Sequence, residues 1–509
     1  MATDRGAGPA GEAAQVAAAE PAGERASGAD RATGAERATG AERASIPEIP
    51  APIAELLATL HRGGHSAYAV GGCLRDALLG REPADWDLTT DAPPDRIQSL
   101  FPHSLYENRF GTVVVRRALA QYEITSFRRD VSYTDHRRPD RVEFGDSIEE
   151  DLARRDFTVN AMAWGGKPGE EPRFVDPHGG RGDLARRLLR AVGDPDRRFR
   201  EDALRMVRAV RLSAALEFEV ETETVAAIGR NAELARHLSG ERIAAELIKL
   251  LAAPRPSVGL GLMERTGLLA VIVPDLARQR GVPQNKIVGE DLWDHTLRTV
   301  DAAPNRTLVR LAALLHDIGK PDTLAEGHFH NHETVGAEIT RAFLTGLHAP
   351  RVLQEQVAHL VRNHMFAYQP SWTDAAVRRF IRKVGPGSID DLMALRAADN
   401  EGSGLSAEAG LLPELGRRVQ NELAAHVALG RNQLAVDGND LRSELGIEPG
   451  REMGRILDML TERVIAEPAL NDRAILIELA RAELIELARA ELVDASTGEG
   501  LSGRTHEAG

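Results

Sequence analysis

Residues 67–90 read AYAVGGCLRDALLGREPADWDLTT, and this stretch decides the fold of the first part of the chain. An apolar run at 67–70 predicts a short strand, which ends at the turn Gly71-Gly72. Residues 73–79 then have the spacing of a helix. The order of strand, glycine turn and helix predicts a mixed α/β head.

Two further stretches extend this head. Residues 86–89 read as a second strand, and the runs 112–116 and 122–127 read as a hairpin-like pair. Asp85 and Asp87 are two residues apart in the strand-like run, so we expect their carboxylates to point to the same face. Such a pair can share Mg²⁺ ions.

A pair of metal-binding carboxylates suits phosphoryl transfer, because the ions activate the attacking hydroxyl and neutralise charge on the triphosphate. A D-x-D pair by itself is equally typical of a strand end or a turn. Here it follows Gly71-Gly72, whose backbone N–H groups can approach phosphates, and Arg75, a cation one helical turn later. Glu123 on the hairpin is either a third catalytic carboxylate or an ordinary exposed strand residue. The sequence therefore predicts nucleotidyl transfer by Glu123 and the two aspartates.

Six motifs in order carry a family resemblance that spans some 180 residues. They are GGCLRD at 71–76, DWDLTT at 85–90, RRDFTVNAM from Arg154, DPHGGRGDL from Asp176, EDALRMVRAVRLSA from Glu201 and ERIAAELIKLL from Glu241. Together they resemble the head and neck of bacterial class II CCA tRNA nucleotidyltransferases, of the polymerase β superfamily. The last four resemble that family's ribose-reading, hinge, base-reading and neck motifs. One departure is Ala203, where relatives usually carry proline; we expect little consequence at a first-turn position.

The resemblance implies template-independent addition of the 3′-terminal CCA to tRNA from CTP and ATP. Gly72 and Arg75 are expected to hold the triphosphate, and Arg155 with Asp156 the ribose. The full nucleotide-binding set implied is Gly71, Gly72, Arg75, Arg154, Arg155, Asp156, Asp202, Arg205 and Arg208.

Asp202 and Arg205 lie three residues apart on a predicted helix, so we expect them to face the same side. A carboxylate accepts from the exocyclic amine of C or A, and a guanidinium donates to the adjacent ring nitrogen. G and U present the opposite order, so this pair would select C and A without a template. The alternative is an intrahelical ion pair.

The polar segment 128–144, RRDVSYTDHRRPDRVEF, predicts a mobile loop. It resembles the flexible loop that CCA-adding and A-adding enzymes have and CC-adding enzymes lack, and so favours the use of ATP. The alternative is an inert surface loop.

Eight of the 16 histidines lie between His295 and His364. The resemblance here is to the HD phosphohydrolase domain, with metal ligands at His295, His316, Asp317 and Asp399. This set of nitrogen and oxygen donors suits a transition metal such as Mn²⁺, Ni²⁺, Co²⁺ or Fe²⁺. Candidates for a second metal or for phosphate contacts are His332, His359 and His364. In relatives with this fusion the module is associated with phosphatase or 2′,3′-cyclic phosphodiesterase activity.

Length and composition predict a multidomain α+β protein. The chain has 509 residues, a net charge of −14 and one cysteine, and it shows neither a membrane-spanning run nor an early apolar segment. We therefore expect a cytoplasmic enzyme acting on tRNA. The predicted parts are a disordered tail at 1–46, the head at 47–195, a helical neck at 196–270, an HD domain at 271–405, and a helical C-terminal region with a disordered end at 406–509.

Two alternatives stay open at this point. A bacterial poly(A) polymerase shares most of the head motifs, although the histidine module argues against it. An inactive tRNA-binding or chaperone-like protein would be expected to lack the acidic residues, which are all present here.

Overall fold

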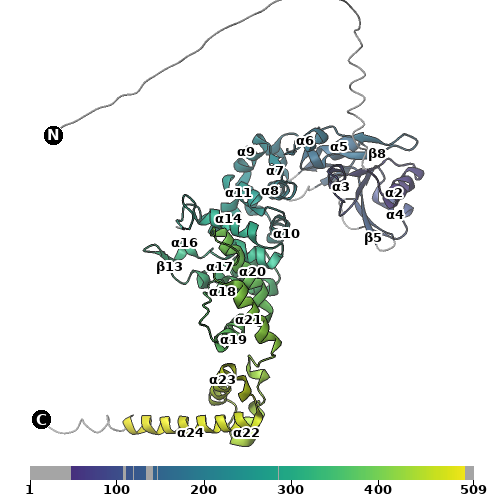
Figure 1. Cartoon of the computed structure of the whole chain (residues 1–509). Helices are drawn as coiled ribbons and strands as arrows, with labels where there is room; N and C mark the ends of the chain where they lie inside the picture. Colours follow the sequence, from purple (N-terminus) through teal and green to yellow (C-terminus); the bar gives the residue numbers. More distant parts are fainter. Residues whose placement is uncertain are drawn as a thin grey trace, which may run out of the picture. The chain divides into compact units, whose positions relative to one another are not determined.

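The structure is a computed structural model that describes residues 48–106, 111–117, 120–132, 141–145, 147–284 and 286–498 (Figure 1). The predicted disordered tail at 1–46 and the end of the chain beyond residue 498 lie outside the described residues. In the described part, no helix is long and apolar enough to cross a membrane.

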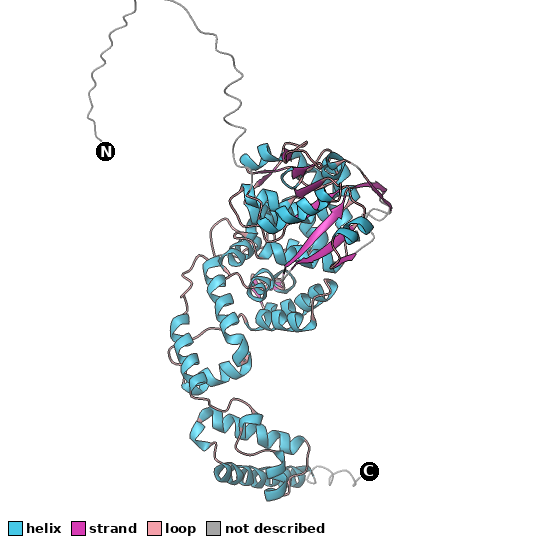
Figure 2. Cartoon of the chain, turned by 90° about the vertical axis from the view of Figure 1, so that its right-hand side faces the viewer, coloured by secondary structure: helices cyan, strands magenta, loops and turns pink. Residues whose placement is uncertain are grey.

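The head is built on a seven-stranded sheet with the strand order β3-β4-β5-β2-β1-β8-β9 (Figure 2). Its strands are β1 (Ala67–Val70), β2 (Asp87–Thr90), β3 (Ser104–Tyr106), β4 (Thr112–Arg117), β5 (Ala120–Ser126), β8 (Ala163–Gly166) and β9 (Arg173–Val175). β1 is antiparallel to β2 and β8, and β4 is antiparallel to β5, which confirms the expected hairpin. β2 and β5 run parallel, with Asp87 opposite Glu123.

Alternation along β1 divides its side chains between two cores, as expected for a strand buried on both faces. Ala69 packs in a core with the helices α2 (Ala51–Arg62) and α4 (Pro94–Leu100). Tyr68 packs in another core with α5 (Ile148–Ala153). Helices thus cover both faces of the sheet, and the expected mixed α/β head is confirmed.

The beginning of β2 differs from the prediction. The strand starts at Asp87, so Asp85 lies in the irregular segment before it. The register explains this: Ala69 pairs with Leu88, and β1 ends one residue later at Val70, which leaves no β1 neighbour for residues before Asp87. The expectation that Asp85 lies in the strand is therefore wrong, and the common orientation of the two carboxylates stays a prediction.

Part of the segment expected to be a loop is regular structure. Strands β6 (Arg128–Ser132) and β7 (Arg141–Phe144) form an antiparallel pair. The prediction of an irregular segment throughout 128–144 is wrong for these two runs, because the backbone groups of each strand satisfy those of the other. Residues 133–140 lie outside the described residues.

Beyond residue 195 the described chain is helical apart from short two-residue strands, as the apolar spacing predicted. The helices are α7 (Pro195–Glu201), α8 (Leu204–Leu216), α9 (Thr222–Asn231), α10 (Gly240–Leu251), α11 (Pro256–Arg265), α12 (Leu268–Ile272), α13 (Pro274–Ala277), α14 (Leu292–Ala302), α15 (Thr307–Leu315), α16 (Lys320–Thr323), α17 (His332–Gly346), α18 (Arg351–Asn363), α19 (Asp374–Val384), α20 (Ile389–Gly402), α21 (Leu412–Ala424), α22 (Gly438–Leu445), α23 (Arg451–Ala466) and α24 (Arg473–Gly498).

Two cores serve this helical part, and the first also includes residues of the head. One extends along the chain from Phe157 to Val419 and includes side chains of α8, α10, α14, α15 and α20. The other extends from Ala428 to Ala480 and belongs to the C-terminal helices. Residues on both sides of the predicted boundary at 270/271 share the first core, and the exact domain boundaries stay predictions.

Candidate active sites

Three acidic residues gather around the start of β2. Asp87 and Glu123 are register partners on parallel strands, so their side chains lie on the same face of the sheet. Loss of hydration raises the pKa of Asp87, and the nearby Asp85 carboxylate raises it further, whereas Arg155 opposes the shift. Asp85 and Glu123 thus both neighbour Asp87, and oxygen donors of this kind are those that Mg²⁺ prefers.

The glycine turn lies against a guanidinium. Gly71 has a φ of 87°, and a Cβ at this position would be 2.8 Å from Arg155 Nη1. Glycine is therefore favoured by the left-handed backbone conformation, and a larger residue would also displace the Arg155 guanidinium. Arg75, expected to hold the triphosphate, donates to both carboxylate oxygens of Asp76 at 2.9 and 2.8 Å and to Asn160 Oδ1 at 2.5 Å. Sequence reasoning missed Asn160, although it is a polar residue within the apolar end of RRDFTVNAM.

A buried aspartate holds the two arginines that begin the same motif. Asp151 is fully buried; Arg154 donates to its Oδ1 at 3.0 and 2.6 Å, and Arg155 donates to its Oδ2 at 3.2 Å. Burial opposes the charge of Asp151, but the two guanidiniums outweigh it and hold the pKa below its ordinary value. Asp151 was not predicted, although its spacing of three and four residues from the arginines is the usual helical signal.

Asp156 is bound in a similar way. Its carboxylate accepts from the Phe157 N–H at 2.8 Å, from Asn160 Nδ2 at 3.1 Å and from Arg208 Nε at 2.7 Å. Burial again opposes ionisation, yet Arg208 and these hydrogen bonds hold the pKa of Asp156 well below its usual range. The Arg208 guanidinium therefore lies beside the residue expected to bind the ribose.

Asp202 and Arg205 do not lie on one helix, contrary to the prediction from the sequence. Asp202 follows the end of α7 in extended conformation, with φ −147° and ψ 106°, and α8 begins only at Leu204. Asp202 Oδ1 accepts from the Leu204 N–H at 3.1 Å, which competes with helix continuation at this point. Arg205 donates instead to Glu201 at 2.8 Å. The assumption of one continuous helix through Asp202 is wrong.

A pocket of about 280 Å³ nevertheless unites these residues. It is lined by Arg154, Arg155, Asp156, Asp202, Leu204, Arg205, Arg208 and Arg242. Six of the nine predicted nucleotide-binding residues thus converge on one cavity. Arg242, at the start of the neck motif, is the lining residue that sequence reasoning missed.

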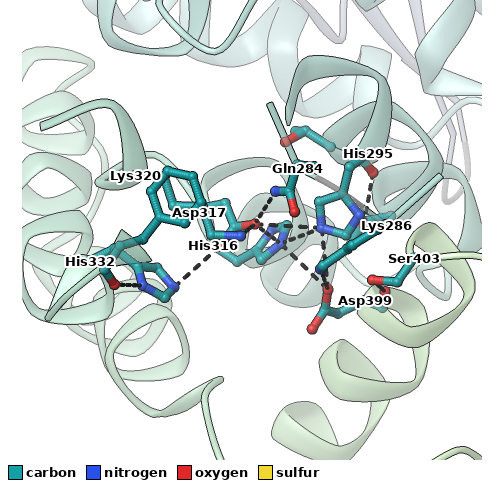
Figure 3. Close-up of polar contacts among 12 residues, drawn as sticks. Gln284, Lys286, His295, His316, Asp317, Lys320, His332, Asp399 and Ser403 are labelled. Carbon is teal, nitrogen blue, oxygen red and sulfur yellow. Dashed lines mark hydrogen bonds and ion pairs between the residues drawn. The ribbon is translucent and has the colours of Figure 1, made fainter. Parts of the chain in front are cut away.

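The four predicted metal ligands of the HD domain also converge, and Figure 3 shows His295, His316, Asp317 and Asp399 gathered around one point. His295 lies on α14, His316 and Asp317 follow α15, and Asp399 lies on α20. His295 Nε2 is 3.1 Å from His316 Nε2 and 3.2 Å from Asp399 Oδ1, and His316 Nε2 is 3.1 Å from Asp317 Oδ2. The four predicted ligands therefore form one buried cluster.

Two of the three further candidates join this cluster. Asp317 Oδ1 is 3.4 Å from His332 Nε2 and 3.5 Å from His364 Nε2. Asp317 thereby forms a second ligand group with His332 and His364, beside the group of His295, His316 and Asp399. His359 is not part of it: its Nε2 is 2.6 Å from the Val384 carbonyl oxygen. The expectation for His359 is wrong, because its place on α18 turns the ring to another backbone segment.

The orientation of the rings fits metal ligation. The Nδ1 atoms of His316, His332 and His364 lie 2.8, 2.9 and 2.7 Å from backbone carbonyl oxygens three residues earlier. Donation of the Nδ1 proton leaves the Nε2 lone pair pointing into the cluster, as in metal-binding histidines. Asp317 Oδ1 is buried and accepts no hydrogen bond within the described residues. The donor set and this orphaned oxygen fit one or two divalent ions.

Three cations border the cluster. Lys320 Nζ is 2.7 Å from Asp317 Oδ2, Arg396 Nη1 is 3.0 Å from Asp399 Oδ2, and Lys286 Nζ is 3.5 Å from Asp399 Oδ1. All three line the same pocket, which also includes Phe329, Met365 and Leu405. Despite burial, these charges and the histidines hold the pKa values of both aspartates below their ordinary range. The surface next to the cluster is therefore suited to an anion.

Comparison with known proteins agrees with this arrangement. Three family models match in succession: the Poly A polymerase head domain at 67–190, the probable RNA and SrmB-binding site of polymerase A at 217–280, and the HD domain at 287–401. The CCA-adding enzyme of Levilactobacillus brevis is 33% identical over 433 residues, which cover 83% of this chain and 95% of that enzyme. The chain belongs to the CCA-adding enzymes.

Other CCA-adding enzymes match different shares of the chain. The enzyme of Geobacillus thermodenitrificans is 46% identical over 225 residues, and this stretch covers 44% of the chain but only 54% of that enzyme. The crystal structure of the Bacillus stearothermophilus CCA-adding enzyme in complex with CTP superposes with a TM-score of 0.66 at 30% identity, covering 86% of this chain and 100% of that one. The head and HD matches, together with the acidic and histidine groups, indicate the use of divalent metal ions.

Proposed function

We propose that the chain adds the 3′-terminal CCA to tRNA, using CTP and ATP without a nucleic-acid template. The observation that carries this proposal is the pairing of Asp87 with Glu123 on parallel strands, with Asp85 two residues before. The CTP complex of the Bacillus stearothermophilus enzyme and the similarity that covers 83% of this chain and 95% of the Levilactobacillus brevis enzyme support it. The proposed substrates are nucleoside triphosphates and tRNA, and we propose a cytoplasmic location because both are used there.

In this proposal the three acidic residues hold Mg²⁺, which when bound activates the 3′-hydroxyl and neutralises the triphosphate. The turn at Gly71-Gly72 gives the phosphates access to the backbone, and Arg75 supplies charge beside it. Arg155 and Asp156 bind the ribose. The pocket between α8 and α10 reads the base, with Asp202 as the acceptor for the exocyclic amine of C or A.

The test is the separate incorporation of radiolabelled CTP and ATP into tRNA that lacks its last three nucleotides. We expect two CMP residues followed by a single AMP. A long AMP tail would identify a poly(A) polymerase, and a chain that binds tRNA without adding either nucleotide would be the inactive tRNA-binding protein considered above.

We further propose a phosphohydrolase activity at the HD site, because Asp317 joins two groups of buried ligands beside three cations. Metal ions bound by these groups would activate water for attack on a phosphoester. Lys286, Lys320 and Arg396 are placed to attract and orient the phosphate. The metal is expected to be Mn²⁺, Ni²⁺, Co²⁺ or Fe²⁺, given the mixed nitrogen and oxygen donors.

This activity is tested with 2′,3′-cyclic AMP and p-nitrophenyl phosphate across Mn²⁺, Ni²⁺, Co²⁺ and Mg²⁺. Asp317→Ala should lose hydrolysis and keep CCA addition, whereas Asp85→Asn should show the reverse. If the wild type hydrolyses neither compound and binds no transition metal, the module is a structural body that positions tRNA.

A further inference from the structure

A short hairpin beside the HD site carries two exposed histidines that the proposed functions do not use. Its strands are β12 (Leu324–Ala325) and β13 (His328–Phe329), and β13 lies beside α16 (Figure 1). His328 and His330 are both exposed, and their ring centroids are 5.8 Å apart with 34° between the ring planes. Among the described residues, the two rings contact each other and have no hydrogen-bond or ion-pair partner. Their nitrogens are therefore available to a ligand from solvent.

The backbone of the hairpin presents these two side chains as a pair. Phe329, between them, lines the HD pocket, so alternation along the strand directs its two neighbours to the opposite face. The turn consists of Glu326 and Gly327, with φ of 51° and 80°. Positive φ at both positions gives the turn type whose twist matches that of a hairpin, although a residue with a side chain adopts it at a cost. The two rings thus leave the same face of a tightly turned segment.

The spacing of the rings suits a single metal ion. An imidazole nitrogen binds an ion such as Zn²⁺ at about 2.0–2.1 Å, so each ring centre lies roughly 3.2 Å from the ion and two ligating rings lie up to about 6.4 Å apart. The observed separation of 5.8 Å falls within this limit. Imidazole favours transition metals, whereas Mg²⁺ and Ca²⁺ prefer oxygen ligands. With only two protein ligands, we expect this pair to bind an ion more weakly than the buried cluster does.

The charges at the HD pocket give such a pair a use. Lys286, Lys320 and Arg396 line the pocket, whereas only two carboxylates do. This excess of positive charge attracts a phosphate, but it repels a metal ion that approaches from solvent. A histidine binds a metal ion in its neutral form, so a histidine pair can hold an ion near the pocket without adding carboxylates that would repel the phosphate.

We propose that His328 and His330 form an outer binding site for a divalent transition-metal ion, which is then passed to the buried HD cluster. The transfer rests on the proposed metal site of the HD domain, whereas binding to the histidine pair does not. His332, at the start of α17, belongs to the cluster and follows His330 by two residues. A very short segment of the chain therefore joins the outer site to the inner one.

The binding step is tested by modifying histidines with diethyl pyrocarbonate, mapped by peptide mass spectrometry with and without Ni²⁺. Asp317→Ala is used beside the wild type, because it should weaken the inner cluster and leave the outer pair intact. His348, which is 65% exposed, is the internal control. We expect Ni²⁺ to protect His328 and His330, but not His348, in both proteins. In His328→Gln, His330 should lose this protection, because chelation needs both rings. Lack of protection, or protection of one ring without the other, would overturn the outer site.

The transfer step is tested by the rate of loading. Metal-free protein is mixed with Ni²⁺, quenched at intervals with a chelator, desalted and analysed for retained metal. The double variant His328→Gln/His330→Gln should load about tenfold more slowly than the wild type and His348→Gln, the low end of the effect expected from a raised local ion concentration. Its final metal content and melting temperature should be unchanged, because the inner ligands remain. Equal loading rates would overturn the transfer. A wild type that retains no ion after the quench would instead overturn the HD metal site, while protection of the histidine pair would still support the outer site.

Discussion

Asp317 belongs to one ligand group of the HD site, and its second carboxylate oxygen lies beside two histidines of the other group, which makes a specific prediction about metal content. Its Oδ2 lies 3.1 and 3.5 Å from His316 and His295, and its Oδ1 lies 3.4 and 3.5 Å from His332 and His364. We expect the wild type to bind two transition-metal ions per chain, because there are two groups. His364→Ala should lose one ion, whereas Asp317→Ala should lose both or bind them much more weakly.

The expected effect on stability follows from linkage. An ion that binds only the folded state, at a free concentration 100 times its Kd, adds about 2.7 kcal/mol to the free energy of unfolding. For a cooperative unit of roughly 150–250 residues, this raises the melting temperature by about 5–10 °C. Chelation removes both ions and should therefore lower the melting temperature of the wild type by about twice this amount, and that of Asp317→Ala by much less.

The assay combines elemental analysis of the purified protein with thermal unfolding before and after chelation. His359→Ala is the control, because His359 contacts the Val384 carbonyl rather than the cluster and should leave the metal content unchanged. Equal losses of metal in Asp317→Ala and His364→Ala would refute the shared role of Asp317. A wild type without bound transition metal would refute the metal site altogether.

The remaining predictions concern the head. Asp87→Asn should abolish both C and A addition and leave tRNA affinity nearly unchanged, measured by extension and filter binding; turnover like that of the wild type would contradict the site. Asp202→Ala should lose discrimination against UTP and GTP, and unchanged specificity in misincorporation assays would argue against base reading. Deletion of 132–139 should spare addition of the two C residues and impair the final A, whereas equal loss of both would indicate a folding defect. Because the folded state lowers the pKa of Asp156, its pairing with Arg208 stabilises the protein above pH about 4 and loses this effect as the pH falls. Urea unfolding of Asp156→Asn between pH 3 and 6 should therefore show a weaker pH dependence than the wild type, and an equal slope would contradict the pairing.

The elements that sequence reasoning placed well are those with local signals. The apolar run before Gly71-Gly72 predicts β1, and the alternating run that contains Glu123 predicts β5, because the pattern of a buried strand repeats every two residues. The HD quartet was found through the resemblance to the HD domain, which the adjacent His316 and Asp317 help to carry. The start of β2 was misplaced because strand ends depend on where the neighbouring strand stops.

Most of the features that sequence reasoning missed depend on contacts between segments that are far apart in the chain. The break before α8 is a local exception: the Asp202 carboxylate accepts from the Leu204 N–H, although EDALRMVRAVRL has an uninterrupted helical pattern. Arg242 reaches Asp202 across 40 residues, and its position at the start of an amphipathic helix is typical of an exposed side chain. His359 was grouped with His364 because both belong to the histidine-rich stretch. His359 lies on α18 and His364 directly follows it, and the two side chains face different partners.

Arg310 shows how distant segments of the chain are fixed relative to one another. It lies on α15, is 6% exposed, and donates to the carbonyls of Leu251, of Ala253 at 2.7 Å and of Ala303 at 3.1 Å. Leu251 is the last residue of α10 and Ala253 follows it, whereas Ala303 follows α14. Helix α10 carries Arg242 and α14 carries His295, so one buried cation satisfies backbone carbonyls from both helices. The apolar run TLVRLAALL predicts the helix but gives no reason for the cation within it. Arg310 thus connects α10, α14 and α15, which serve both candidate sites. Its role follows from the packing of these three helices and not from the sequence of α15 alone.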